Sequence, residues 1–417
     1  MSNQVGDPRR VLRREGFRST RRNPAERWIR PKRGFRKTAS QSPGVRSERN
    51  AVKWIKPGII RCEAGLMLDV LDDEARKTGW EIRLYPSTKR TATVGGHVAG
   101  GSGGVGSIRH GLLRDPGNVN AVRVVTLEDD PRVLELRGRD INKVNHAYGT
   151  NGIVTELEMP LTPAFPWADL IAVFDDFMTA ARFGEALGEA DGVVVNECSV
   201  IARPIPEHFK PLREFIPDGS ATAFCLVAES SVEWFECLVA DFGGSVCCRK
   251  SAAESARTTP LYECTWNHTT LYAIKADPSI TYLQTLFEPG RSLEMAEHFY
   301  GRFGDETPMC LEFVRLNGKV GAFAVQLVRY TTDERMDEII EYLEDHGAPV
   351  FNPHAPILED GGMKVVDVEQ LEFKKVADPH GLSNPGKMRA WWEESQVETR
   401  KEGALYPVRE GGKVFKG

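Results

Sequence analysis

The glycine-rich stretch TVGGHVAGGSGGVGS, residues 93–107, most restricts what this chain can fold into. Gly101, Gly103 and Gly106 have the spacing G-x-G-x-x-G of a dinucleotide-binding βαβ unit, which needs a buried strand before the glycines and a helix after them. The glycines that precede Gly101 weaken a buried strand. A proline and two glycines at 111–117 interrupt a helix after Gly106, because proline costs about 3 kcal/mol and glycine about 1 kcal/mol inside one.

The acidic residue that such a unit requires is present, since Glu128 and Asp129 follow roughly 20 residues later. A parallel βαβ unit nevertheless needs its crossover helix, so a site of the NAD type is rejected. Two alternatives remain for the stretch. Its backbone N–H groups, together with nearby Ser and Thr hydroxyls, form a phosphate-binding loop, or the glycines only allow tight turns in a surface loop. The glycines alone favour the surface loop.

Charge is distributed unevenly along the 417 residues, a length that suggests two domains. The net charge is −5, yet residues 1–53 hold 16 of the 54 Lys and Arg and only 4 of the 59 Asp and Glu. This basic, Arg-rich segment is predicted to be disordered over 1–50. It is a solvated arm, a nucleic-acid-binding arm, a transit peptide or the product of a start-site error. A solvated arm is favoured over nucleic-acid binding, because no folded basic face supports the latter.

The eight cysteines show no C-x-x-C pair and no metal-ligand spacing, and the chain contains no H-x-H pair. Scattered cysteines of this kind are typical of reduced, buried side chains in a cytosolic protein. We therefore expect no metal site and no iron–sulfur cluster. No apolar run approaches the length of a membrane-spanning helix.

Hydrophobic periodicity predicts regular structure from residue 59 onward. A short strand is expected at 59–65, a helix at 66–80, a strand hairpin at 121–138 and a strand at 149–161.

Residues 163–370 are predicted to form an α+β unit. The stretches ATAFCLVAES and MCLEFVRLNGKVGAFAVQLVRY are expected to be strands, the second one folded at the Asn-Gly turn 317–318. The clearest helix is expected at 331–347, with Thr331 and Glu334 as its capping box. The alternation of strands, hairpins and helices predicts an antiparallel sheet with helices on one face.

Several motifs follow one another in a recognisable order: CEAG, a helix, PST, TVGG, the glycine-rich stretch, a strand hairpin, GTNGIVT and finally DPHGLSNPGKM. In order and spacing they resemble the vanillyl-alcohol-oxidase-type FAD oxidoreductases, in particular the branch of D-lactate dehydrogenases and the D-subunit of glycolate oxidase. The resemblance covers 55–165 and 375–388 well. It implies an α+β fold with the second half of a PCMH-type FAD-binding domain at 51–162, a substrate or cap domain at 163–370, and a segment at 371–417 that returns to the flavin domain.

The same resemblance implies FAD as the cofactor. In that family TVGG and the glycine-rich stretch line the diphosphate and the flavin ring with backbone donors, the strand of GTNGIVT contacts the cofactor through its backbone, and the returning segment lies near the flavin. By match, the cofactor-binding residues are Pro86, Ser87, Thr93, Gly95, Gly96, Gly101, Ser102, Gly106, Ile153, Val154, Asn384 and Lys387.

The expected substrate site lies at the face of the flavin, covered by the second domain. The sequence WNHT at 266–269 is the best local candidate, because it brings an indole, an amide, an imidazole and a hydroxyl together. We hypothesise that His268 accepts the substrate's hydroxyl proton, a role that an imidazole suits at neutral pH; a structural histidine is the equal alternative. Asn267 and His354 complete the predicted catalytic set.

The resemblance implies an FAD-dependent dehydrogenase or oxidase of a 2-hydroxy acid or similar alcohol. Its electrons would pass to a quinone, a cytochrome or oxygen, and a homodimer is among the states that it allows. The expected location is cytoplasmic, with peripheral attachment to a membrane through the acceptor as a variant.

One departure from the family keeps a second interpretation open. The family's first phosphate loop, of the type R-G-x-G-x-S/T, has no counterpart before residue 59. This favours a start-site artefact or truncation at 1–50, and it supports the alternative of a catalytically impaired flavoprotein remnant that acts at most as a binding module.

Overall fold

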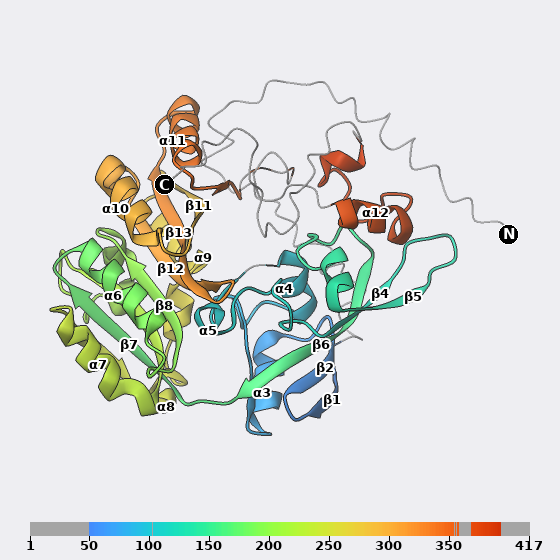
Figure 1. Cartoon of the computed structure of the whole chain (residues 1–417), viewed down its shortest axis with the longest axis horizontal. Helices are drawn as coiled ribbons and strands as arrows, with labels where there is room; N and C mark the ends of the chain where they lie inside the picture. Colours follow the sequence, from blue (N-terminus) through green and yellow to red (C-terminus); the bar gives the residue numbers. More distant parts are fainter. Residues whose placement is uncertain (1–49, 102, 354, 356, 358–367, 393–417) are drawn as a thin grey trace.

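The computed structural model describes residues 50–101, 103–353, 355, 357 and 368–392. The basic segment at 1–49, Ser102 and His354 lie outside the described residues, so the expectations that concern them are not addressed by the fold. Two antiparallel sheets lie next to each other in this part of the chain, joined where strand β6 of the first sheet leads into strand β7 of the second (Figure 1).

The first sheet has six strands in the order β1-β2-β6-β4-β5, with β3 paired to β6 beyond the end of β2. The hairpin expected at 121–138 is formed by β4 and β5, and the expected strand at 149–161 is β6, which continues through Pro160. The strands are β1 (Val52–Lys56), β2 (Ile59–Glu63), β3 (Trp80–Ile82), β4 (Ala121–Val125), β5 (Val133–Arg137) and β6 (Ile153–Pro163).

The second sheet has eight strands in the order β10-β7-β9-β8-β12-β13-β11-β14. Strands β12 and β13 form the expected hairpin, whose Asn317 and Gly318 both have positive φ, as a two-residue turn of this kind requires. The strands are β7 (Trp167–Phe174), β8 (Val195–Ile201), β9 (Ala221–Ala228), β10 (Ser245–Lys250), β11 (Ile280–Phe287), β12 (Met309–Leu316), β13 (Lys319–Arg329) and β14 (Val350–Phe351).

Helices cover one face of the second sheet, as expected. Apolar residues of α6, α7, α10 and α11 form one core with the side chains on that face of the strands, while α9 lies on the opposite face (Figure 1). The helices are α3 (Leu68–Arg76), α4 (Val94–Gly100), α5 (Ser107–His110), α6 (Phe177–Glu189), α7 (Val232–Asp241), α8 (Ala252–Ser255), α9 (Asn267–Ala276), α10 (Ser292–Phe303), α11 (Asp333–Asp345) and α12 (Val368–Ala377).

Two local expectations were wrong. Helix α11 is capped by the hydroxyl of Thr332, which accepts from the backbone N–H of Arg335, so the cap lies one residue after the predicted Thr331. The stretch VGGHVAG, treated as a loop in the sequence, forms helix α4. Glycine is a poor helix former, and this helix depends on its contacts: the amides of Val94 and Gly95 donate to the carbonyls of Leu66 and Ala64.

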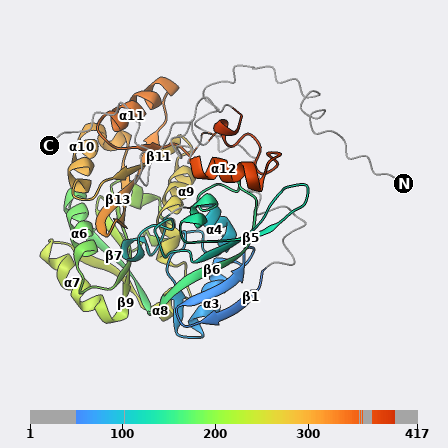
Figure 2. The same cartoon turned by 45° about the vertical axis from the view of Figure 1, so that its right-hand side comes forward.

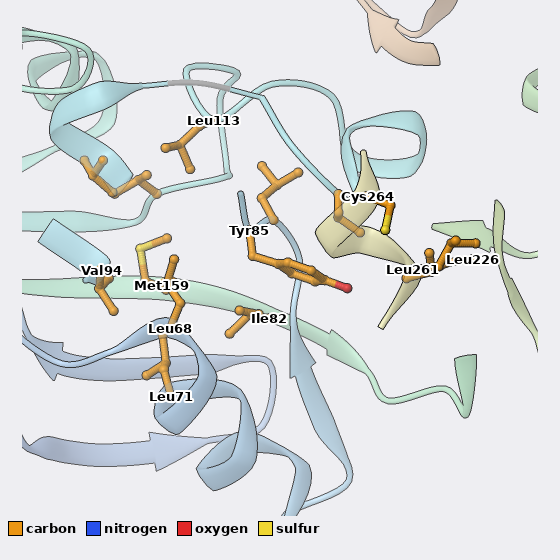
Figure 3. Close-up of a cluster of buried hydrophobic side chains, with 14 of the residues drawn as sticks. Leu68, Leu71, Ile82, Tyr85, Val94, Leu113, Met159, Leu226, Leu261 and Cys264 are labelled. Carbon is orange, nitrogen blue, oxygen red and sulfur yellow. The ribbon is translucent and has the colours of Figure 1, made fainter. Parts of the chain in front are cut away.

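A second core joins the two sheets. It includes Leu68, Leu71 and Ile82 from the first part of the chain and Leu226 and Leu261 from the second. In Figure 3 the ring of Tyr85 points from the first part toward Leu261 and Cys264, across the junction. This junction is buried and apolar, so it holds the two sheets in a fixed relative position. No helix within the described residues is both long and apolar enough to cross a membrane.

Candidate functional site

Helix α4 begins the region that the sequence assigns to the cofactor. Thr93 caps it, since its hydroxyl accepts from the N–H of Gly96 at 3.1 Å. The N–H of Gly95 donates to the carbonyl of Ala64 at 2.8 Å, and a Cβ on Gly95 would lie 2.7 Å from the Ala64 Cβ. The glycine therefore allows the helix to approach the turn that follows β2.

The glycine run, which we define as Gly100–Gly106, is also held by the chain itself. The amide of Gly101 donates to the carbonyl of His97, and that of Gly106 donates to the carbonyl of Asn196 on β8 at 2.7 Å. Both glycines have positive φ. A Cβ on Gly101 would lie 2.1 Å from the Cβ of His146, which no side chain could tolerate.

These contacts limit the donors that are available for the expected mode of binding. The sequence interpretation treated the glycine amides as free donors for a diphosphate, but the amides of Gly95, Gly96, Gly101 and Gly106 all donate within the chain. Gly95, Gly101 and Gly106 are also buried, and only Gly96 is partly accessible. Gly100 is different, because an added Cβ there would meet no atom within 4 Å.

His97 on α4 is a site residue that sequence reasoning missed. The side chain is buried, and within the described residues neither ring nitrogen has a hydrogen-bond partner. Burial lowers its pKa to about 4. A buried polar group without a partner is costly, so the ring nitrogens are candidates for a hydrogen bond to a bound group. The only sequence signal was its place directly after TVGG.

The beginning of β6, where it pairs with β4, carries an exposed side chain. Ile153 pairs with Val125 and Val154 pairs with Val124, and the side chain of Ile153 is left 45% exposed. Gly152 before them has a φ of 79°, and a Cβ there would lie 3.0 Å from the carbonyl oxygen of Val125. An exposed isoleucine at a strand start is suited to contact a bound group.

The C-terminal segment packs against this region (Figure 2). The amide of Asn384 donates to the backbone carbonyl of Tyr148. Lys374 on α12 is buried and donates to the carbonyl of Thr150 at 2.7 Å and to Asp378 at 2.6 Å. Two expected cofactor residues, Asn384 and Lys387, therefore lie on a segment that contacts GTNGIVT. Burial lowers the pKa of Lys387.

Asp378 organises the turn of the motif DPHGLSNPGKM. Its carboxylate accepts from the backbone N–H groups of Leu382 and Ser383 at 2.7 and 2.9 Å, besides the ammonium of Lys374. The aspartate is fully buried. A buried carboxylate with three donors fixes the loop that carries Asn384, which explains why this motif needs an aspartate at its start.

The start of α9 meets the glycine run. A Cβ on Gly103 would lie 3.2 Å from the Cη2 atom of Trp266. The next residue, Asn267, is exposed and accepts from the amide of Gln284 at 2.9 Å. His268 is half-buried, its Nδ1 has no partner within the described residues, and burial lowers its pKa. The structure thus brings the predicted catalytic stretch next to the predicted cofactor loop.

Arg315, a basic residue that could bind a substrate carboxylate, is engaged within the chain. The guanidinium of Arg315 donates to the backbone carbonyls of Ile108 at 3.1 Å and Gly188 at 2.8 Å, which ties α5 to the second sheet. Arg203 and Lys275 are exposed. Sequence reasoning also missed two buried acids beneath Trp266, Glu197 and Glu312, whose alternation with apolar strand residues gave little signal.

Comparisons with known proteins agree with this geometry. Residues 45–136 match the model of a family described as FAD binding domain. The chain is 30% identical over 118 residues to a D-lactate dehydrogenase of Anaerostipes hadrus, and 30% identical over 125 residues to one of Archaeoglobus fulgidus. These matches cover 25% and 27% of this chain and 23% and 26% of the relatives. The chain thus matches about a quarter of the length of these curated relatives.

The fold has solved counterparts. Two structures of alkyldihydroxyacetonephosphate synthase match with TM-scores of 0.53 and 0.54, at 15% and 16% identity, over 81% of this chain and 66% of the other. At such identity the likeness concerns the fold alone. The match at residues 45–136 and the likeness to these structures support a PCMH-type FAD-binding domain, and the fold is α+β, with a second, antiparallel sheet next to that domain.

FAD is the cofactor that the matched domain indicates, and the described residues fit it. The imidazole of His97 is buried without a partner, Gly100 has open space on its Cβ side, and Ile153 is an exposed apolar side chain. These three features offer hydrogen-bonding atoms, room and apolar surface for a bound nucleotide. Within the described residues no group of three potential metal ligands gathers.

Proposed function

We propose that this chain is an FAD-dependent dehydrogenase or oxidase that removes a hydride from a 2-hydroxy acid or a similar alcohol. The observation that carries the proposal is the meeting of two segments, Trp266 at the start of α9 and Gly103 in the glycine run. This contact supports a position of His268, two residues after Trp266, near the glycine run. The D-lactate dehydrogenase relatives support a hydroxy acid as the substrate class.

His97, Gly100 and the strand start at Ile153 would hold the cofactor, together with Asn384 and Lys387 of the returning segment. FAD, when bound, supplies the acceptor of the hydride at flavin N5. The chain's own contribution is a proton acceptor: within the described residues the Nδ1 atom of His268 has no hydrogen-bond partner, and burial lowers the pKa of the ring, which favours its neutral form at pH 7. A neutral imidazole can take the hydroxyl proton of the alcohol as its C–H bond breaks.

The domain organisation is part of the proposal. We infer a flavin-binding unit at 51–162, a substrate or cap unit at 163–370 and a returning segment at 371–417. The end of β6 at Pro163 supports the first boundary, and the contacts of Lys374 and Asn384 with residues 148–150 support the third unit. The electron acceptor, whether quinone, cytochrome or oxygen, and the cytoplasmic location belong to the same proposal.

The test replaces His268 by Ala and by Asn in protein loaded with FAD. We expect both variants to keep bound FAD and to lose the anaerobic reduction of flavin by D-lactate or another 2-hydroxy acid by about 10²–10⁴-fold, the usual contribution of a general base. The surface variant His380→Asn, whose ring lies on the exposed turn after α12, is the matched control. Reduction at the wild-type rate in His268→Ala would dismiss the proposed base.

A second candidate is a catalytically impaired remnant that serves as a binding module. It is favoured by the internal hydrogen bonds of Gly95, Gly96, Gly101 and Gly106, which leave fewer donors for a diphosphate. Titration of the purified chain with FAD separates the two candidates. A saturable yellow complex with quenched flavin fluorescence supports the oxidoreductase, and absence of any complex supports the remnant.

A further inference from the structure

Two buried glutamates lie side by side on the face of the second sheet that is turned toward the glycine run. Glu197 is on β8 and Glu312 is on the neighbouring strand β12, where it pairs with Ser199. Their side chains are 2% and 0% exposed. The two carboxyls are close enough that each one affects the pKa of the other. No Lys, Arg or His in the described part of the chain forms an ion pair with either one.

Both carboxyls bind the same tryptophan. The backbone N–H of Trp266 donates to Oε1 of Glu312 at 2.6 Å, and its indole Nε1–H donates to Oε2 of Glu197 at 3.1 Å. Trp266 has a φ of 52°, a conformation that a non-glycine residue adopts only when its surroundings compensate for the strain. Its two hydrogen bonds to the acid pair are the compensation that the structure shows.

The indole spans the distance from the sheet to the glycine run. On one side the indole N–H donates to Glu197. On the other side the ring lies against Gly103, because a Cβ built on that glycine would be 3.2 Å from the indole Cη2 atom. The ring of Phe323 on β13 lies 6.1 Å away between centroids. The orientation of this ring is therefore determined by the acids below it and by the glycine run above it.

A single proton shared by the two acids accounts for the geometry. Two adjacent buried carboxylates cannot both be charged. Oε2 of Glu312 has no donor as long as both groups are ionised, and a carboxyl proton held between them supplies one. Burial is the largest cause that raises the pKa of Glu197, and the charge of the neighbouring Glu312 raises it further. Burial also raises the pKa of Glu312.

The groups around the pair offer no cation to replace that proton. On the strands themselves these are Cys198, Ser199 and Cys310, and the thiol of Cys310 donates to Oε1 of Glu312 at 3.3 Å. On α5, which packs against both strands, the guanidinium of Arg109 lies over the rings of Phe165 and Trp167, and burial lowers the pKa of His110 to about 3. The charged groups that act on His268 are Lys275 on α9 and Glu263 in the turn before that helix.

We propose that Glu197 and Glu312 are a positioning pair that clamps Trp266 against the glycine run, so that the indole forms the wall of the FAD site contributed by the second sheet. This inference rests on the proposed function for the identity of the ligand, but the clamp itself does not need it. Neither glutamate touches the reacting atoms. Their effect on the cofactor passes through the position of the indole.

The first test follows Trp266 in the protein without FAD. The chain has eight tryptophans, so 5-fluorotryptophan is incorporated and the resonance of Trp266 is assigned by its loss in Trp266→Phe. We expect Glu312→Gln and Glu197→Gln to keep this resonance in place, because an amide can donate to the remaining carboxylate and still accept from the tryptophan. Glu312→Leu removes the acceptor and should shift or broaden it. An unmoved resonance in Glu312→Leu would overturn the clamp.

The second test measures the shared proton. A carboxyl whose pKa is raised in the folded state keeps its proton while the unfolded chain loses it, so stability falls as pH rises above the ordinary glutamate range. Between pH 5 and 7 the unfolding constant of the wild type should rise relative to that of Glu197→Gln by about tenfold per pH unit. A ratio that does not change with pH would show that no proton is held. This test does not use Glu312→Leu, so it remains decisive if that variant does not fold.

The third test concerns the wall. FAD titrations should show at least about tenfold weaker binding for Glu312→Leu or Trp266→Ala, and binding within about threefold of the wild type for Glu312→Gln. Equal affinity in all variants would refute the role of the indole at the cofactor. If the wild type itself binds no FAD, the proposed function fails, while the fluorine resonance and the pH slope still decide whether the acids clamp Trp266.

Discussion

The buried ion pair between Lys374 and Asp378 makes the docking of the C-terminal segment testable. The two side chains are 3% and 0% exposed and lie 2.6 Å apart. Asp378→Asn keeps the shape of the side chain but leaves the ammonium of Lys374 without its carboxylate. Removal of one partner from a buried pair costs about 3–5 kcal/mol. The carbonyl of Thr150 and the ring of Trp391, 4.9 Å away, still face the ammonium, so we expect the lower value, about 3 kcal/mol.

The loss should appear locally. The segment 368–392 contacts the rest of the chain through a few bonds around residues 127 and 142–151, so it can open without global unfolding. A loss of about 3 kcal/mol increases the open population by about 100-fold. Hydrogen exchange of peptides from 368–392, read by mass spectrometry, should accelerate by that factor, while exchange in β8 and β12 stays unchanged.

Glu372→Gln on the same helix is the matched control. Its ion pair with Lys375 is exposed, with side chains 61% and 41% accessible, and exposed pairs contribute less than about 1 kcal/mol. Exchange in this variant should stay within a few-fold of the wild type. If Asp378→Asn and Glu372→Gln exchange at the same rate, the buried pair does not hold the segment and the reasoning is refuted.

Three further outcomes are expected. Gly106→Ala and Gly117→Ala both place a Cβ on a residue with φ near 90°, but only at Gly106 would that Cβ lie 1.9 Å from a carbonyl oxygen, that of Arg83. In urea unfolding, Gly117→Ala should lower the free energy of unfolding by about 1–2 kcal/mol, and Gly106→Ala should lower it clearly more. Equal losses in the two variants would contradict the clash at Gly106. The guanidinium of Arg61 donates to Glu135, Glu156 and Glu158 at 2.8–3.0 Å, and its side chain is 11% exposed. In urea unfolding, Arg61→Leu should lower the free energy of unfolding by about 2 kcal/mol, and this loss should be smaller in 1 M salt. Burial lowers the pKa of His97 to about 4 in the folded protein, below its unfolded value. As pH falls from 6.5, the unfolded chain therefore binds the proton first and the folded state loses stability, so between pH 8 and 5 the wild type should lose about 2 kcal/mol of unfolding free energy that His97→Phe does not lose. Identical pH profiles of the two proteins would refute this expectation.

The sequence predicted elements where one physical signal dominated. The period of α11, the Asn-Gly turn between β12 and β13 and the hairpin of β4 and β5 each follow from local residues. Helix α4 could not be predicted in this way, because three of its seven residues are glycines. Its stability comes from hydrogen bonds to Ala64 and Leu66, which are contacts about 30 residues away in the sequence.

The candidate site also has a part that local sequence motifs predicted and a part that depends on contacts between distant residues. The motifs around 93–107, 149–155 and 378–388 indicated which segments would gather, and the contacts of Lys374, Asn384 and Trp266 show where those segments meet. The pair of Glu197 and Glu312 could not be found from sequence, since it depends on the register between two strands that are more than 100 residues apart.

The glycine run also shows which glycines carry functional information. Gly101 and Gly106 are required by positive φ and by close backbone contacts, so they would be glycines with or without a cofactor. Gly100 has no such reason: it lies in α4, and a Cβ there would meet no atom within 4 Å. Gly100→Ala should therefore stabilise the protein without FAD by about 0.5–1 kcal/mol, measured by urea unfolding. If the open space belongs to the cofactor, the same methyl group should weaken FAD binding at least about tenfold. A variant that is more stable and binds FAD as the wild type does would place the cofactor elsewhere.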